Sequence, residues 1–332
     1  MLLNNSIELL KDKKNLLAFS AGVDSSALFF LLNELKIDFD IAIVDYSIRE
    51  QSVEEVNYAK ELSSTYQKKI HILKAPKIEN NFEATARKIR YNFFEQLTSE
   101  FNYDNLLTAH HLGDRFEWML MQFCKGAGCA ELAGMKLVES RKNYNLIRPL
   151  LHLDKSELQN YLDKNNIKYF IDESNYDEGI KRNYFRVNHS TPLLDKYLDG
   201  IKKSFSYIDE DVNDLLELAK INTIKDFIYF NSKDKRSDIY SIDKILKSRN
   251  IMISSNERNL LKENKTCVIA RSYVVTWHLN YVFIAPYISS NISMPHKFKE
   301  NMRILKIEPK LRAYFFTNPD VFESLEGFVE LQ

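Results

Sequence analysis

The stretch Phe19-Ser20-Ala21-Gly22-Val23-Asp24-Ser25-Ser26 decides the fold of this chain. It follows the apolar run 16–19, which is typical of a buried parallel strand, and it precedes apolar residues spaced like one face of a helix. A strand, a short loop of Ser and Gly and a helix start form an anion site, because backbone N–H groups and the positive end of the helix dipole converge there. The hydroxyls of Ser20, Ser25 and Ser26 can add donors.

Asp24 does not suit a bare phosphate cradle, because a carboxylate repels phosphate. It fits a helix N-cap, a magnesium ligand, or both. The stretch is not the P-loop of kinases and GTPases, since the Gly-Lys-Ser/Thr ending is missing. Taken alone, it is equally compatible with an ordinary turn between a strand and a capped helix.

The first half of the chain alternates apolar runs with helical patterns. Runs at 41–44, 70–73 and 106–109 each precede apolar residues with helical spacing. Repeated units of this kind predict an α/β fold, a parallel sheet with helices on both faces. Ligands of such sheets bind outside the carboxyl ends of the strands, where the motifs described below fall.

After about residue 200 the pattern changes. Residues 205–265 are expected to be mostly helical, and the runs 268–270, 274–277 and 282–284 are expected to form strands of a small sheet. The length of 332 residues also suggests about two domains. We therefore predict an α/β domain over 1–204 and a smaller α+β domain over 205–332.

Composition narrows the class of protein. Lys+Arg and Asp+Glu both number 46, so binding to nucleic acid would need a local basic patch. We expect no signal peptide and no membrane span, because no basic start precedes a long apolar run and no stretch approaches ~20 apolar residues. The three cysteines form no C-x-x-C pair, which predicts a reducing cytoplasm without disulfides or structural zinc.

A cluster of His, Asp and Glu follows the run 106–109. The sequence reads Ala109-His110-His111-Leu112-Gly113-Asp114, and Glu117 comes one helical turn later on the face of Asp114. Such a cluster can hold a metal, position a nucleophile or carry protons. For Glu117 alone, an acidic helix start is the simpler interpretation.

Charged residues upstream form a second candidate group. Glu83, Arg87 and Arg90 share one helical face, and two guanidiniums there suit phosphate or carboxylate recognition. A solvated face with Glu83–Arg87 pairing is the alternative. Further motifs follow downstream, at 125–128, 148–151, 172–175 and 182–186.

In this order the motifs resemble the tRNA(Ile)-lysidine synthetase family, a member of the ATP pyrophosphatase group. The resemblance covers roughly residues 15–190. The matching pieces are the Ser20–Ser25 loop, Val44-Asp45 with Ile48-Arg49, Glu83–Tyr91, Ala109–Glu117, Gly126, Gly128, Gly134-Met135, Arg148-Pro149-Leu150, Asp172–Asn175 and Arg182–Arg186.

The resemblance implies a ligase that attaches lysine to carbon 2 of the wobble cytidine of the CAU-anticodon isoleucine tRNA. ATP would adenylate the cytosine oxygen, and the lysine ε-amine would then displace AMP. The implied cofactors are ATP and Mg²⁺, and the implied partners are tRNA(Ile) and L-lysine, in the cytoplasm and without a membrane. A homodimer is a further option, and residues 205–332 would contact the tRNA.

The resemblance also implies residue roles. The implied catalytic residues are His110, Asp114, Glu117, Arg182 and Arg186. The implied ATP-binding residues are Ser20, Ala21, Gly22, Val23, Asp24, Ser25 and Asp45. The implied substrate-binding residues are Glu83, Arg87 and Arg90, and the implied metal ligands are Asp24 and Asp114.

Several positions depart from the family pattern and keep other readings open. Ala21 stands where the family usually has Gly, and Tyr46-Ser47 stands where it usually has His-Gly. Gly113 replaces an acidic residue, Arg115 replaces Gln, and Trp118 replaces Thr. The departures permit an inactive tRNA- or nucleotide-binding relative. A tRNA thiolase of the same group is the other alternative, but it would need reactive cysteines or an iron–sulfur site.

Overall fold

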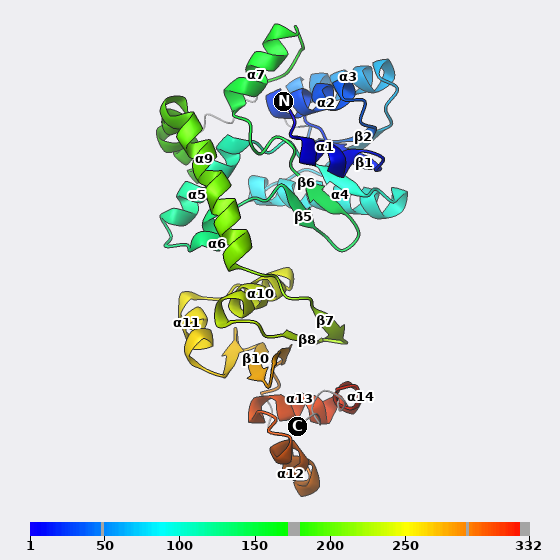
Figure 1. Ribbon diagram of the computed structural model, residues 1–332. Coiled ribbons are helices and arrows are strands. Elements are labelled where there is room, and N and C mark those ends of the chain that lie inside the picture. Colours follow the sequence, from blue (N-terminus) through cyan, green and yellow to red (C-terminus); the bar gives the residue numbers. More distant parts are fainter. Residues whose placement is uncertain (48–49, 172–179, 290–291, 326–332) are drawn as a thin grey trace. The chain divides into compact units, whose positions relative to one another are not determined.

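A computed structural model describes residues 1–47, 50–171, 180–289 and 292–325 (Figure 1). The chain divides into two compact units, Met1–Asp209 and Glu210–Gln332. The predicted motif pieces at 48–49 and 172–175 lie outside the described residues.

The first unit contains a six-stranded sheet whose order is β3-β2-β1-β4-β6-β5. Its strands are β1 (Asn15–Ala18), β2 (Phe39–Asp45), β3 (Ile70–Lys74), β4 (Asn105–Leu107), β5 (Val138–Ser140) and β6 (Asn145–Ile147). All pairings are parallel except that of β5 with β6, which confirms the predicted parallel sheet and adds one antiparallel edge strand. The short connection 141–144 allows that reversal, because antiparallel neighbours need only a tight turn.

The helices of this unit connect the strands or follow them. They are α1 (Asn4–Leu10), α2 (Val23–Glu34), α3 (Glu50–Thr65), α4 (Phe82–Phe101), α5 (Leu112–Phe123), α6 (Cys129–Leu132), α7 (Lys155–Lys164), α8 (Lys181–Phe185) and a π-helical turn η2 (Arg186–Ser190). The next helix, α9 (Thr191–Leu215), continues past the end of the unit.

The central strands β1, β2 and β4 are largely apolar on both faces, so each face of the sheet has its own core. Leu17, Ile41 and Leu107 pack with α1, α2, α3 and α7 on one face. On the other face Leu16 and Leu106 pack against α4. Burial on both sides explains why the strands read as continuous apolar runs rather than as alternating ones, and it confirms helices on both faces.

Arg115 attaches the second half of α9 to α5. Its guanidinium is buried, donates to both carboxylate oxygens of Asp209 at 2.9 and 2.5 Å, and lies 4.3 Å from the ring centre of Phe205. Its Nε also donates to the carbonyl of Ala133 at 2.9 Å. A departure from the family pattern therefore has a structural role here, since a shorter amide could not make this fork.

The second unit is built on an antiparallel sheet of order β7-β8-β11-β10-β9. Its strands are β7 (Asn222–Ile224), β8 (Phe227–Asn231), β9 (Thr266–Ile269), β10 (Tyr273–His278) and β11 (Tyr281–Pro286). Helices α10 (Lys235–Ser248) and α11 (Ser255–Glu263) cover one face, and α12 (His296–Ile304), α13 (Pro309–Thr317) and α14 (Pro319–Glu323) cover the other.

The strands predicted after residue 267 are confirmed as β9, β10 and β11. The prediction of helices through 205–265 is wrong in part, because β7 and β8 lie there. The run 227–230 is Phe-Ile-Tyr-Phe, whose aromatic and β-branched residues fit a pleated sheet buried on both faces. Polar residues around the run favoured the helical interpretation.

Two predictions about the chain as a whole concern membranes and cysteines. No helix in the described part of the chain is long and apolar enough to span a membrane. Cys124, Cys129 and Cys267 are free thiols.

We predict that Arg115→Gln lowers the free energy of unfolding by about 2 kcal/mol, because it removes a charge-assisted fork and leaves part of Asp209 unpaired. Urea unfolding measures the change. Arg141→Gln is the matched control, since the Arg141–Glu139 pair is exposed on both sides and contributes less than about 1 kcal/mol. Equal effects of the two variants would contradict the structural role of Arg115.

Candidate active site

The loop between β1 and α2 ends at a helix start that no side chain caps. Gly22 is the N-cap of α2, and the Ser25 hydroxyl lies 3.2 Å from both the backbone N of Ser20 and the carbonyl of Gly22. Asp24 lies in the first turn of α2, so its predicted role as an N-cap is wrong. The uncapped first turn leaves backbone N–H groups for an anion.

Ala21 has a left-handed backbone, with φ of 59°. This conformation costs about 1 kcal/mol for a residue with a Cβ, which explains why the family usually has Gly here. The Ala21 carbonyl accepts the N–H of Phe170 at 2.9 Å, and Gly22 pairs with Phe170 in a short parallel bridge. This pairing holds the loop in its strained shape.

The two carboxylate oxygens of Asp24 differ in their surroundings. Its Oδ1 is buried and has no hydrogen-bond partner among the described residues, while Oδ2 lies 3.9 Å from Nε2 of His111. Burial raises the pKa of Asp24, and the neighbouring His111 opposes that rise. An orphaned carboxylate oxygen beside an anion-binding loop is suited to a cation bound together with phosphate.

His111 and Asp114 form a capping box at the start of α5. His111 Nδ1 accepts the N–H of Gly113 at 3.0 Å, and Asp114 accepts the N–H of His111 at 3.1 Å. A Cβ at position 113 would lie 2.7 Å from Cε1 of His111, so glycine is the residue that leaves room for this ring. In this chain a side chain at position 113 would therefore require the His111 ring to shift.

Glu117 is buried and binds two arginines from later in the chain. Its carboxylate accepts Nε of Arg182 and, at 2.8 Å, Nε of Arg186. Arg182 also donates to Asp114 at 2.7 Å. Arg186 opens the π-helical turn η2, a rare element that is often found at functional sites. Four of the five predicted catalytic residues, Asp114, Glu117, Arg182 and Arg186, therefore form one ion-pair network.

The network shifts the protonation equilibria of its members. Burial alone would raise the pKa of Asp114, but His111 and Arg182 lower it well below its usual range. Burial alone would lower the pKa of Arg182, but Asp114 and Glu117 raise it. Burial lowers the pKa of His110 to about 4, and its Nδ1 lies 2.9 Å from the Thr108 hydroxyl. His110 is therefore neutral at physiological pH.

A cavity of about 320 Å³ lies at the carboxyl end of the parallel strands. The structure brings nine predicted site residues to its wall, namely Ser20, Asp24, Ser25, Arg87, Arg90, His110, Asp114, Arg182 and Arg186. The volume is within the range of small-molecule sites. Cationic, acidic and neutral polar groups therefore converge on one concave surface.

Some predicted residues lie outside this wall. Asp45 accepts the N–H of Ser47 at 2.8 Å, so its carboxylate stabilises the turn after β2, while Val44 and Tyr46 line the cavity. Glu83 and Glu117 do not line it, and Glu117 acts behind the wall through the two arginines. Ala21, Gly22 and Val23 contribute backbone rather than lining side chains.

Sequence reasoning missed Lys155 and gave Tyr46 no role. Lys155 follows the N-cap Asp154 at the start of α7, lines the cavity and lies close enough to Asp24 to lower its pKa. The capping box of α7 was a detectable helix signal, but nothing in the sequence placed that helix at the cavity. The Tyr46 hydroxyl donates to the Ala86 carbonyl at 3.0 Å, which joins the end of β2 to α4.

The donor set for a metal is small. Among the described residues no group of three or more His, Cys, Asp or Glu side chains is placed to hold an ion. Both oxygens of Asp114 already accept hydrogen bonds, whereas Asp24 keeps an orphaned one. The residues fit a magnesium ion that one carboxylate and the phosphates of a nucleotide would share.

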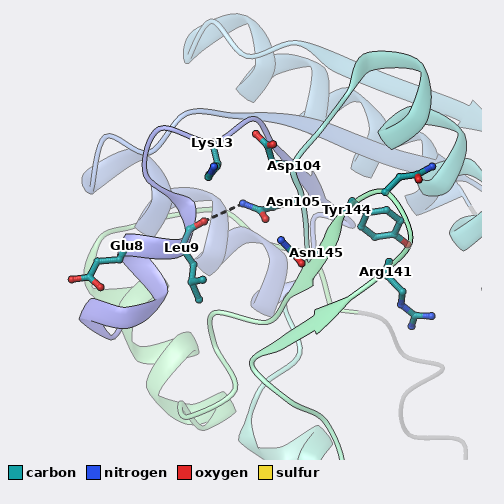
Figure 2. A pocket seen from close by; sticks show the side chains of 9 residues that line it. Glu8, Leu9, Lys13, Asp104, Asn105, Arg141, Tyr144 and Asn145 are labelled. Carbon is teal, nitrogen blue, oxygen red and sulfur yellow. Dashed lines mark hydrogen bonds between the residues drawn. The ribbon is translucent and has the colours of Figure 1, made fainter. Parts of the chain in front are cut away.

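A second cavity, of about 400 Å³, lies at the opposite end of the strands (Figure 2). Asn105 and Asn145, the first residues of β4 and β6, line it, and Asn105 donates to the Leu9 carbonyl. None of the predicted site residues lines this cavity. Ligands of parallel sheets bind at the carboxyl ends of the strands, so the cavity beside Asp24 is the candidate active site.

The sequence matches known proteins along almost its whole length. The PP-loop domain family matches residues 2–191. The chain is 41% identical to a tRNA(Ile)-lysidine synthase of Campylobacter jejuni (strain RM1221) over 96% of this chain and 97% of that protein. It is 40% identical to one of Helicobacter pylori (strain ATCC 700392 / 26695) over 93% of this chain and 91% of that protein.

The fold also resembles a solved structure, the U34-tRNA thiolase NcsA from Methanococcus maripaludis with its [4Fe-4S] cluster. The TM-score is 0.54 at 19% sequence identity, and the match covers 65% of this chain and 80% of that one. At this identity the similarity concerns the fold alone.

We predict that His110 makes the unfolding free energy depend on pH. The pKa of His110 is about 4 in the folded protein and about 6.5 when unfolded, so the unfolded chain binds more protons in between. The contribution of His110 to the free energy of unfolding is therefore largest above about pH 6.5. It falls by up to roughly 3 kcal/mol as the pH drops to 4.

The measurement is urea unfolding of the wild type and of His110→Gln between pH 4 and pH 8. The difference between the two unfolding free energies should change with pH below 6.5 and stay constant above it. A difference that is constant across the whole range would show that His110 titrates normally.

Proposed function

The chain belongs to the tRNA(Ile)-lysidine synthase family of PP-loop, ATP-using ligases, and on that premise we propose that it attaches L-lysine to the wobble cytidine of the CAU-anticodon isoleucine tRNA. The observation that carries the proposal is the single cavity at which the loop before α2, the His110–Asp114 segment and the two arginines meet. The cavity offers an anion site at the start of α2 and, on the same wall, the neutral ring of His110.

The proposed reaction has two steps. The cytosine O2 attacks the α-phosphorus of ATP, and the bond from that phosphorus to the β-phosphate oxygen breaks, releasing pyrophosphate. The neutral lysine ε-amine then attacks carbon 2, the carbon–oxygen bond to AMP breaks, and the amine loses a proton. Both steps need the reacting groups held close together in a site with little water.

In the first step, the N–H groups at the start of α2 would bind phosphate, assisted by the Ser20 and Ser25 hydroxyls. Asp24 is the residue that would hold magnesium, which would screen the charge of the phosphates when bound. Lys155 adds a positive charge on the same wall.

Arg182 and Arg186 are proposed to contact the developing phosphate charge, because both guanidiniums line the cavity. Glu117 is then a positioning residue that acts through them, since its carboxylate is buried and occupied by both arginines. Asp114, ionised and bound to Arg182, has the same supporting role.

In the second step, His110 would orient the lysine amine. Its pKa of about 4 makes it a weak base at neutral pH, but its uncharged ring does not repel an amine and can share a hydrogen bond with it. A desolvated site also favours the neutral, nucleophilic form of the amine.

The tRNA is proposed to reach the cavity along local basic groups, because the net charge of the chain is zero. Arg87 and Arg90 line the cavity and follow Glu83 on α4, which supports a role near the substrate. Residues 205–332 are proposed to contact the tRNA as well. A homodimer has no supporting observation here.

The experiment that tests the proposed function supplies ATP, Mg²⁺, lysine and tRNA(Ile) with a CAU anticodon. Sustained pyrophosphate release should require both lysine and this tRNA, and the wobble nucleoside should gain the mass of lysine less one water. Pyrophosphate release without tRNA, or a sulfur-containing product, would contradict the proposal.

We predict that Asp24→Asn lowers the rate of pyrophosphate release by roughly 100-fold or more, because a neutral amide cannot replace a metal-binding carboxylate. Asp45→Asn is the matched control, since the Asp45 carboxylate caps a turn and does not line the cavity, and its effect should be much smaller. Similar losses in both variants would exclude the special role given to Asp24.

A further inference from the structure

Trp118 is an exposed aromatic residue on an otherwise well-buried stretch of α5. Its side chain is 45% exposed, whereas Arg115, Phe116 and Glu117 just before it are buried. Tryptophan is on average among the more buried residues, so a half-exposed indole beside a catalytic cavity calls for a physical explanation.

The helix places Trp118 next to the cavity. Trp118 follows Asp114 by four residues, so the two lie on one face of α5, about 6 Å apart along the helix axis. Asp114 lines the cavity and binds Arg182. The indole therefore lies one helical turn beyond Asp114 and the cavity wall, on the helix face that carries the Asp114–Arg182 contact.

Gly134 holds the indole in place. A Cβ at Gly134 would lie 2.9 Å from Cδ1 of Trp118, and the backbone there has φ of +65°. One edge of the ring thus packs against bare backbone, while much of the side chain remains exposed. A fixed aromatic ring loses little entropy when a ligand stacks on it.

One cation lies near the ring on this helix face. Arg182 contacts Asp114 one turn before Trp118, and its side chain is 35% exposed. An aromatic platform near a positive charge suits a flat base that is linked to a phosphate.

We propose that Trp118 is a stacking platform for an unpaired base of the anticodon loop, beside the base that enters the cavity. The inference rests on the proposed function, because it takes the tRNA as substrate. Stacking would hold the loop open at the rim and orient the reacting base, which makes Trp118 a positioning residue. The family usually has Thr at this position, so the contact is an adaptation of this chain.

The test uses the full chain and an RNA stem-loop with a CAU anticodon. Binding should quench the tryptophan fluorescence of the wild type but not that of Trp118→Phe, because the only other tryptophan in the sequence, Trp277, is buried in the second unit. Trp118→Ala should weaken stem-loop binding roughly 5- to 150-fold, and Trp118→Phe by less than about 5-fold.

Phe123→Ala is the matched control. Phe123 is 66% exposed on the same helix but lies on a different face from Trp118, so binding of the stem-loop should not change. ATP binding should be equal in all variants. The stacking proposal alone would be wrong if Trp118→Ala binds the RNA as tightly as the wild type, RNA does not quench the fluorescence of the wild type, and the wild type still modifies tRNA. A wild type that binds ATP but no RNA would overturn the proposed function and this inference together.

Discussion

The carboxylate of Glu117 is 1% exposed and accepts hydrogen bonds from Arg182 and Arg186, which lie 65 and 69 residues later in the chain. The rest of the site depends on this contact. It attaches the segment after α7 to the helix that begins with His111, and so it brings both arginines to the cavity wall. Removal of both arginines would leave the buried Glu117 carboxylate without these partners, which costs about 3–5 kcal/mol.

The departures from the family pattern are consistent with one another once the contacts are known. Gly113 leaves room for the His111 ring as a helix cap, and Arg115 makes a buried fork with Asp209. Ala21 keeps the left-handed backbone that glycine usually supplies. The change at Gly113 removes an acidic side chain next to the cavity, but Asp24, Asp114, Arg182 and Arg186 still line it.

Much of the fold could be predicted because apolar runs and helical spacing report burial directly, as for 41–44 and 106–109. Strand β8 was missed because its polar surroundings favoured a helix. The sheet topology predicts that the residues at the strand ends lie close together, but it does not predict the role of each residue. Only the structure shows that Glu117 lies behind the wall, that Asp45 caps a turn and that Lys155 faces Asp24, since such contacts depend on distant parts of the chain.

The central claim is that Glu117 acts through the arginines that it binds. A double-mutant cycle of Glu117→Gln and Arg186→Gln tests it, with tRNA-dependent pyrophosphate release as the measured rate. If the claim holds, each single variant loses nearly as much activity as the double variant, a coupling of about 2 kcal/mol or more. If the two losses simply add, Glu117 and Arg186 act independently and the claim is wrong.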